Sequence, residues 1–175
     1  VANQIGVPTL LQEQNSYAGV TNRLLAKKAQ KICVAYEGME KYFPKDKVKI
    51  TGNPIRQNLF KTDFDLPEAY NYFNIPVGKR VILVLGGSLG ARTINNAIKN
   101  NLDQVKNENV FLIWQTGKLY YDEMIKSSNE SGIKNVFVTA FIDRMEYAFA
   151  VTDVIISRAG AGTVSELCLA GKPVI

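Results

Sequence analysis

Histidine is absent from this chain of 175 residues, and cysteine occurs only twice. The lack of histidine excludes a histidine general base and histidine metal ligands for this sequence. The two cysteines, Cys33 and Cys168, are too far apart to indicate a disulfide framework or a metal motif. We interpret both as small buried hydrophobic residues, and a reducing cytoplasm fits this composition best.

Long apolar runs and a basic-then-apolar leader are missing as well. Apolar runs such as residues 81–85 and 154–156 are far shorter than the roughly 20 residues that a membrane-spanning helix needs. No membrane span is therefore predicted. The chain begins at Val1 and stops at Ile175, inside a stretch with the pattern of a strand, so we expect it to be a fragment.

Positive charge is concentrated near the start of the chain, whose net charge is +5. Residues 1–52 contain eight Lys and Arg against four Asp and Glu, whereas residues 53–175 contain 13 against 12. Lys27, Lys28 and Lys31 follow an amphipathic stretch, so attraction to an anionic membrane surface is one interpretation. Charge alone favours the other interpretation, a solvated helix face.

From residue 80 onward, short β-branched runs alternate with helical stretches. Strands are predicted at 81–85, 110–114, 136–139 and 153–156, and helices at 91–101, 119–128, 143–151 and 163–170. Continuous apolar strands between helices indicate a parallel sheet covered on both faces, and hence a doubly wound α/β domain.

The first fifty residues have a similar pattern, with strands expected at 7–11, 32–35 and 48–51 and a helix at 20–29. Gly52-Asn53-Pro54 then interrupts the pattern, and only a short helix at 67–73 is predicted before the next strand. We place a domain boundary at this break, between residues 1–52 and residues 53–175.

The sharpest local motif follows the strand at 81–85 and reads Gly86-Gly87-Ser88-Leu89-Gly90-Ala91-Arg92. Glycines at a strand-to-helix turn let the backbone approach a ligand, and the helix N-terminus attracts a phosphate group. The alternative is a tight turn that needs glycine only for packing. A nicotinamide-binding fingerprint is incomplete, because Leu85 replaces its first glycine and no acidic residue ends the next strand.

A second motif at a strand end begins at Ser157-Arg158 and runs to Glu166. Glu166 is interpreted either as a residue of the first helical turn, favoured by the helix dipole, or as a carboxylate that binds a ribose diol. At the proposed boundary, Arg56 supplies a planar guanidinium suited to a diphosphate. A polar cluster, Leu11-Gln12-Glu13-Gln14-Asn15-Ser16, lies at the end of the first strand and is either a site or an ordinary loop.

Taken in order, six motifs resemble one family. They are Glu13-Gln14-Asn15, Thr51-Gly52-Asn53-Pro54-Ile55-Arg56, Gly86-Gly87-Ser88-x-Gly90-Ala91-Arg92, Gln115-Thr116-Gly117-Lys118, Phe141-Ile142-Asp143-x-Met145 and Ser157-Arg158-x-Gly160-Ala161-x-Thr163-Val164-Ser165-Glu166. The sequence is similar to the MurG family, the transferases that add N-acetylglucosamine from UDP-N-acetylglucosamine to undecaprenyl-diphosphoryl-N-acetylmuramyl-pentapeptide. The resemblance implies two Rossmann-like domains of the GT-B glycosyltransferase type, both incomplete in this chain. Residues 1–52 would end the acceptor and membrane-side domain, and residues 53–175 would begin the donor-nucleotide domain.

The resemblance also implies roles for individual residues. The backbone of Ile142 would contact the uracil and Glu166 the ribose hydroxyls, while Asn15 would face the transferred sugar. The diphosphate would be surrounded by Arg56, Gly87, Ser88, Gly90 and Thr163, and the nucleotide wall shaped by Ala161 and Gly162. Glu13 is the nearest candidate for a catalytic base in this chain, although a structural role at the lip of the cleft is favoured.

The implied activity is that of a hexosyltransferase: inverting transfer in peptidoglycan synthesis, and with it in cell wall biogenesis, cell shape and cell division. Neither a metal nor a cofactor is expected, and neither is a nucleic acid partner. The expected partners are UDP-N-acetylglucosamine, the lipid-linked acceptor and the inner membrane surface, with a peripheral location on the cytoplasmic face of the cell membrane. The alternative is a UDP-binding module that is inactive without a partner or its missing segments, and we expect this fragment alone to be inactive.

Overall fold

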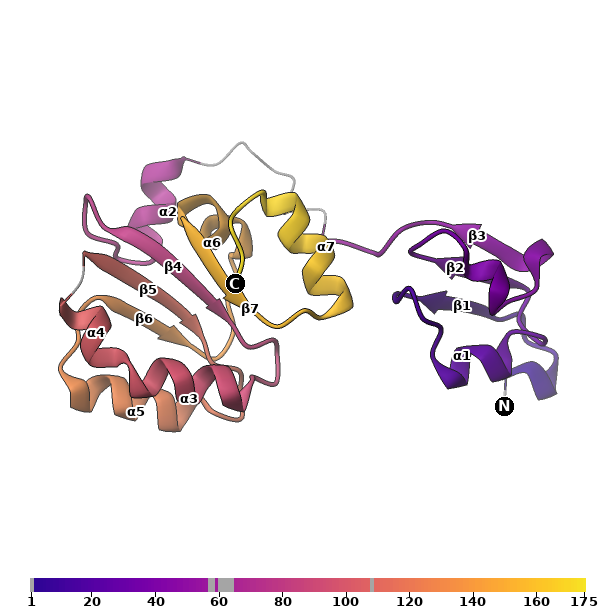
Figure 1. The fold of residues 1–175 in the computed structure, drawn as a ribbon, viewed down its shortest axis with the longest axis horizontal. Helices are drawn as coiled ribbons and strands as arrows, with labels where there is room; N and C mark the ends of the chain where they lie inside the picture. Colours follow the sequence, from indigo (N-terminus) through magenta and orange to yellow (C-terminus); the bar gives the residue numbers. More distant parts are fainter. Residues whose placement is uncertain (1, 57–58, 60–64, 108) are drawn as a thin grey trace. The chain divides into compact units, whose positions relative to one another are not determined.

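The computed structural model describes residues 2–56, 59, 65–107 and 109–175, and it divides the chain into two compact units (Figure 1). Unit 1 is Val1–Ile55 and unit 2 is Arg56–Ile175. Each unit contains its own parallel sheet and its own hydrophobic core. The predicted α/β class with parallel sheets is therefore confirmed.

Unit 1 contains a three-stranded parallel sheet in the order β1-β2-β3, made of β1 (Leu10–Glu13), β2 (Lys31–Val34) and β3 (Val48–Ile50). Helix α1 (Val20–Leu25) connects β1 to β2, and three short 3-10 helices occupy Ala2–Ile5, Met39–Lys41 and Lys45–Lys47. Ile32 and Val34 of β2 are fully buried against Ala18, Met39 and Phe43. The alternation of buried and exposed residues along β2 thus packs one face of this sheet on the core.

Unit 2 contains a four-stranded parallel sheet in the order β6-β5-β4-β7. Its strands are β4 (Arg80–Leu85), β5 (Val110–Gln115), β6 (Val136–Thr139) and β7 (Val154–Ser157). The chain moves outward from β4 to β6 and then returns to the other side of β4 to add β7. This reversal of strand order makes the carboxyl ends of β4 and β7 the position where open α/β sheets bind ligands.

Helices cover both faces of the unit 2 sheet (Figure 1). One layer contains α2 (Leu66–Tyr72), α6 (Met145–Val151) and α7 (Ala161–Ala170), and the other contains α3 (Arg92–Asn100), α4 (Leu102–Asn107) and α5 (Tyr121–Ser131). Leu83 and Ile113 belong to the first core, whereas Val84 and Trp114 belong to the second. Successive residues of the central strands therefore serve opposite cores, which is why these strands are apolar without interruption.

Several element limits differ from the sequence prediction. Strand β1 lies later than the predicted strand at 7–11, α1 ends at Leu25 rather than at residue 29, and α4 was not predicted. Cys168 is exposed rather than buried, and Cys33 is half-buried. The differences fall at element ends and at exposed positions, where a hydrophobic pattern carries little information about the partner surface.

Candidate functional site

A cavity of about 370 Å³ opens at the carboxyl edge of the unit 2 sheet. Residues from the ends of β4, β5 and β7 and from the loops after β4, β6 and β7 line it, together with Arg56, the start of α6 and the first turns of α7. They are Arg56, Leu85, Gly87, Ser88, Gln115, Phe141, Met145, Ser157, Arg158, Thr163 and Glu166. The cavity thus brings together five predicted site residues that lie as far as 110 positions apart in the sequence.

The loop between β4 and α3 is held by close backbone packing against the loop after β5. Gly90 has a φ of +86°, and a Cβ atom on it would lie 2.2 Å from the carbonyl oxygen of Thr116. Gly117 has a φ of +78°, and a Cβ atom there would lie 2.1 Å from the backbone nitrogen of Gly90. The glycines are therefore required by packing between the two loops, in addition to any approach of a ligand. Gly87 and Ser88 remain on the cavity wall.

Helix α7 begins at Ala161, two residues before its predicted start at residue 163. Gly160 is its N-cap residue in an extended conformation, and its carbonyl oxygen accepts a 2.8 Å hydrogen bond from the Val164 N–H. Glu166 consequently lies beyond the first turn, which contains no acidic residue. The interpretation of Glu166 as a residue of the first helical turn is wrong, because the dipole effect is confined to that turn.

Glu166 instead forms a bidentate ion pair with Arg56. The Arg56 Nε donates to Glu166 Oε1 at 3.0 Å and one terminal nitrogen donates to Oε2 at 3.1 Å. The side chains are 41% and 20% exposed, so solvent screens the attraction and leaves it modest in free energy. The guanidinium of Arg56, predicted to bind the diphosphate, thus contacts the carboxylate of Glu166, predicted to bind the ribose. If each group binds its own part of a nucleotide, this ion pair must break first.

Ile142 lies in the loop after β6, with its side chain in the core. Its backbone N–H donates a 3.0 Å hydrogen bond to Oε1 of the buried Gln115. Because this donor already has a partner, the predicted contact of the Ile142 backbone with a base relies on its carbonyl group. Gln115 belongs to a motif singled out in the sequence, but no role was predicted for it.

In unit 1, Glu13 ends β1 as a carboxylate that is only 3% exposed. It accepts four hydrogen bonds: from the Asn15 N–H and Nδ2, both at 3.1 Å, from the Gly19 N–H at 2.8 Å and from Asn22 Nδ2 at 3.0 Å. A shallow hollow of about 330 Å³ surrounds this network and includes Asn15 in its lining. Glu13 therefore has a structural role, because it fixes the loop that contains Asn15. Its partner Asn22 was not identified in the sequence analysis.

Burial raises the pKa of the Glu13 carboxyl, but the hydrogen bonds from Asn22, Gly19 and Asn15 together outweigh this effect and lower its pKa below the ordinary value of 4.5. A carboxylate stabilised in this way is a poor proton acceptor at neutral pH. The geometry thus favours the structural role over that of a general base.

We predict that the Glu13→Gln variant loses stability in unit 1 chiefly near neutral pH. The contribution of the ionised carboxylate is fully present above its ordinary pKa and disappears as the pH falls through the lowered one. The difference between the thermal midpoints of the wild type and Glu13→Gln should therefore be larger at about pH 7 than at about pH 3. Glu40→Gln is the matched control on an exposed residue. A difference for Glu13→Gln that does not change with pH would contradict the assignment.

The sequence model of the glycosyltransferase family 28 C-terminal domain matches residues 81–175, which is more than half of the chain. The chain belongs to glycosyltransferase family 28. The matched range includes the sheet of unit 2 except its first residue, Arg80, and, apart from Arg56, every residue that lines its cavity.

Curated relatives within this family are similar over nearly the whole chain. The UDP-N-acetylglucosamine–N-acetylmuramyl-(pentapeptide) pyrophosphoryl-undecaprenol N-acetylglucosamine transferase of Parabacteroides distasonis is 56% identical over 97% of the chain and 46% of the relative. The chain spans about half the length of the curated relatives that it matches. The resemblance to the MurG family is confirmed.

Solved structures show the same architecture. The crystal structure of Acinetobacter baumannii MurG has a TM-score of 0.60 and 29% identity, covering 97% of this chain and 45% of that one. A UDP-GlcNAc 2-epimerase from Neisseria meningitidis has a TM-score of 0.71 at 18% identity, covering 99% of this chain and 54% of that one. The epimerase shows similarity of fold alone, and together these structures confirm the predicted GT-B type.

The predicted site residues of this family 28 chain fall into separate groups. Arg56, Gly87, Ser88, Thr163 and Glu166 line the cavity of unit 2, whereas Glu13 and Asn15 belong to the hollow of unit 1. Gly90, Ile142, Ala161 and Gly162 lie in the adjoining loops and helix start without lining the cavity. The lining residues without a predicted role are Leu85, Gln115, Phe141, Met145, Ser157 and Arg158. In the sequence, a polar residue such as Gln115 at the end of an otherwise apolar strand was the feature that could have indicated such a lining position.

The described residues contain no cluster of three or more His, Cys, Asp or Glu side chains suited to a metal ion. No helix among them combines the length and apolar character needed to cross a membrane.

Proposed function

We propose that this chain is part of an inverting glycosyltransferase that moves N-acetylglucosamine from UDP-N-acetylglucosamine to lipid-linked N-acetylmuramyl-pentapeptide in peptidoglycan synthesis. The observation that carries the proposal is the cavity of unit 2, where a glycine-rich strand-to-helix loop, an arginine and a glutamate converge. The names of the curated relatives support the same donor and acceptor.

In this proposal, unit 2 binds the nucleotide and unit 1 belongs to the acceptor side. Ser88, Gly87 and the nearby Gly90 surround the diphosphate at the start of α3, and Thr163 approaches it from α7. Arg56 moves from Glu166 to the diphosphate, and Glu166 accepts hydrogen bonds from the ribose hydroxyls. Gly162 and Ala161 shape the wall beside the nucleotide, the Ile142 carbonyl contacts the base and Asn15 faces the sugar.

The reaction is a displacement at the anomeric carbon. The 4-hydroxyl of the muramyl sugar attacks and gives its proton to a general base, the bond to the diphosphate breaks with inversion, and UDP leaves with the electron pair. Negative charge develops on the leaving diphosphate, where backbone N–H groups and the Arg56 guanidinium stabilise it. Fixed donors of this kind are worth about 3 kcal/mol each in the transition state of related group transfers.

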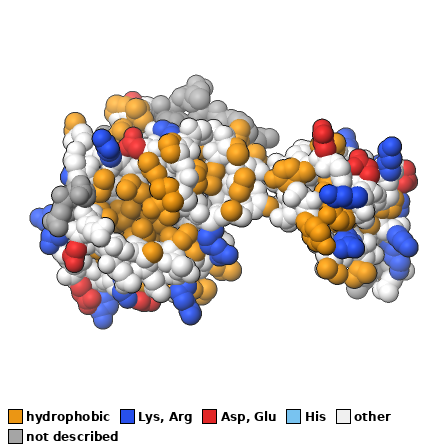
Figure 2. Space-filling model, viewed as in Figure 1, with side chains coloured by type: hydrophobic (Ala, Val, Ile, Leu, Met, Phe, Trp, Pro, Cys, Tyr) orange, Lys and Arg blue, Asp and Glu red, His pale blue; other side chains and the backbone are white. Residues whose placement is uncertain are grey.

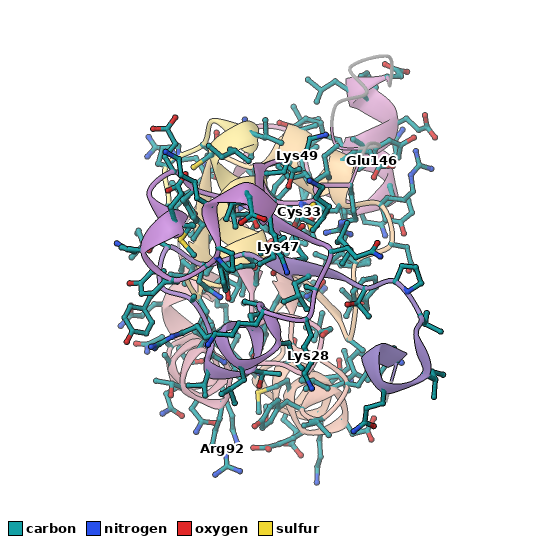
Figure 3. The ribbon with its side chains drawn as sticks, turned by 90° about the vertical axis from the view of Figure 1, so that its right-hand side faces the viewer. Lys28, Cys33, Lys47, Lys49, Arg92 and Glu146 are labelled. Atoms are coloured by element: carbon teal, nitrogen blue, oxygen red, sulfur yellow. The ribbon has the colours of Figure 1, made fainter. Side chains whose placement is uncertain are left out.

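Unit 1 offers features suited to a peripheral position on the cytoplasmic face of the membrane. Apolar side chains of its first 3-10 helix and of α1 are exposed, with Ile5 at 70%, Val20 at 69% and Leu24 at 75%. Figure 2 shows orange hydrophobic and blue basic side chains together on this unit. Lys28, Lys47 and Lys49, labelled in Figure 3, also belong to it. Apolar insertion combined with basic charge is the usual basis of reversible binding to an anionic surface.

Titration of the chain with UDP, UDP-N-acetylglucosamine and NAD, side by side, tests the nucleotide assignment. We expect binding of both uridine nucleotides and none of NAD, because the dinucleotide fingerprint is incomplete. Tight NAD binding without UDP binding would refute the proposal. Transfer by the full-length protein, with UDP binding but no transfer by these 175 residues, would identify the chain as the binding part of the enzyme.

We predict that Glu166→Ala weakens UDP binding by about 1–3 kcal/mol, the typical effect of losing hydrogen bonds to a charged group. Isothermal calorimetry measures the change. Glu130→Ala is the matched control, since Glu130 is an exposed residue of α5, away from the cavity. Unchanged UDP affinity in Glu166→Ala would contradict the ribose assignment.

A further inference from the structure

Gln115 is the last residue of the central strand β5 and is only 3% exposed. Gln115 lines the cavity of unit 2, between the loop after β4 and the loop after β6. Its backbone carbonyl accepts a hydrogen bond from the Gly86 N–H at 3.3 Å, so the position of the residue is fixed from the strand itself. A polar side chain at this depth needs partners for both ends of its carboxamide.

Only one end of that carboxamide has a partner among the described residues. Oε1 accepts the hydrogen bond from the Ile142 N–H at 3.0 Å, and a backbone N–H can only donate. This contact assigns the oxygen of the amide and therefore the orientation of the whole group. The Nε2 amino group is left with no acceptor in the described part of the chain, at the wall of the cavity. It is a fixed hydrogen-bond donor for whatever occupies the cavity.

We propose that Gln115 is a specificity-determining residue of the donor site, whose Nε2 donates a hydrogen bond to the O4 carbonyl of uracil. The inference rests on the proposed function, in which the neighbouring backbone of Ile142 contacts the base. Uracil presents the O4 acceptor where cytosine presents an amino donor. A hydrogen-bond donor such as Nε2 pairs with O4 of uracil. With cytosine the same donor would face the amino group, which is also a donor.

The discrimination between uracil and cytosine depends on the free-energy cost of burying a hydrogen-bond donor without an acceptor. With uracil bound, Nε2 is paired, whereas with cytosine both Nε2 and the base amino group would lose their hydrogen bonds to water without replacement. Sites that bind a substrate polar group in this way reject the mismatched analogue strongly. The same strand end that supports Ile142 therefore selects the base.

The test uses the full-length protein and calorimetric titration with UDP and with CDP. Gln115→Glu keeps an acceptor for the Ile142 N–H but replaces the Nε2 donor with an acceptor, which suits cytosine. We expect UDP to bind about tenfold more weakly and CDP at least as tightly as in the wild type. Gln115→Met, of similar volume without either polar group, should lose about tenfold for UDP and little for CDP.

Gln104→Glu, on an exposed position of α4, is the control for the change in charge and should leave both affinities unchanged. An unchanged ratio of UDP to CDP affinity in both Gln115 variants, whether binding is intact or equally weakened, would overturn the role of Gln115 alone. A wild type that binds neither nucleotide would refute the proposed function and this inference together, so the two failures differ.

Discussion

Gly117→Ala is expected to lower the free energy of unfolding of unit 2 by about 2–5 kcal/mol. A Cβ atom at this position would lie 2.1 Å from the nitrogen and 2.3 Å from the Cα of Gly90, in a backbone conformation with a φ of +78°. An alanine would destabilise the unit in two ways. The left-handed conformation costs about 1–2 kcal/mol, and the displacement of two backbone segments costs about 1–3 kcal/mol. Thermal and chemical denaturation measure the loss.

Gly78→Ala is the matched control for Gly117→Ala. Gly78 has a φ of +81°, but a Cβ atom there has nothing within 4 Å. The control should therefore show the conformational cost alone, about 1–2 kcal/mol. Equal destabilisation by the two substitutions would contradict the close contact between the loops after β4 and β5. If the contact exists, Gly117→Ala should also weaken UDP binding, because it displaces the loop that carries Ser88.

Asn95→Ala is expected to destabilise unit 2 by about 3 kcal/mol. Asn95 is fully buried in α3, where its Nδ2 donates to the Thr116 carbonyl at 2.8 Å and its Oδ1 accepts from Trp114 Nε1 at 2.9 Å. The substitution leaves a buried indole N–H and a buried carbonyl without partners, at about 1–3 kcal/mol for each unsatisfied group. It also removes the side-chain link between α3 and the end of β5.

Asn96→Ala is the control for Asn95→Ala, since Asn96 is the exposed neighbour in the same helix and should change stability by about 0.5 kcal/mol or less. Denaturation measures the stability of both variants. Trp114 is the single tryptophan of the chain, so its fluorescence reports directly on the lost hydrogen bond. An Asn95→Ala variant with wild-type stability and an unchanged emission maximum would show that this bridge is dispensable.

These two predictions concern the support of the candidate site rather than its ligand contacts. Gly90, Gly117 and Asn95 join the loops after β4 and β5 to the start of α3, and they hold Gly87 and Ser88 at the cavity wall. The loop after β4 is therefore held in place by the residues that follow β5. Such preorganisation matters because donors that are already in place need no rearrangement as charge develops.

Much of the fold follows from local patterns. The strands of unit 2 were predicted within one or two residues, because each is a short, largely apolar run between helices, and the central strands β4 and β5 are buried along most of their length. Helix α4 was missed because it follows α3 almost without a break and presents mostly exposed residues. The start of α7 was placed two residues late, since Ala161 and Gly162 form its first turn without a clear capping signal.

The sequence by itself determined the α/β class, the order of the elements, the family and the two glycine-bearing strand ends, because these depend on residue type and spacing along the chain. Tertiary structure alone decided the partners of the polar groups. Arg56 pairs with Glu166 across 110 positions, Ile142 with Gln115 across 27, and Asn95 with Trp114 across 19. Such contacts depend on strand register and on how layers pack, and a linear pattern does not specify either distance or direction between side chains.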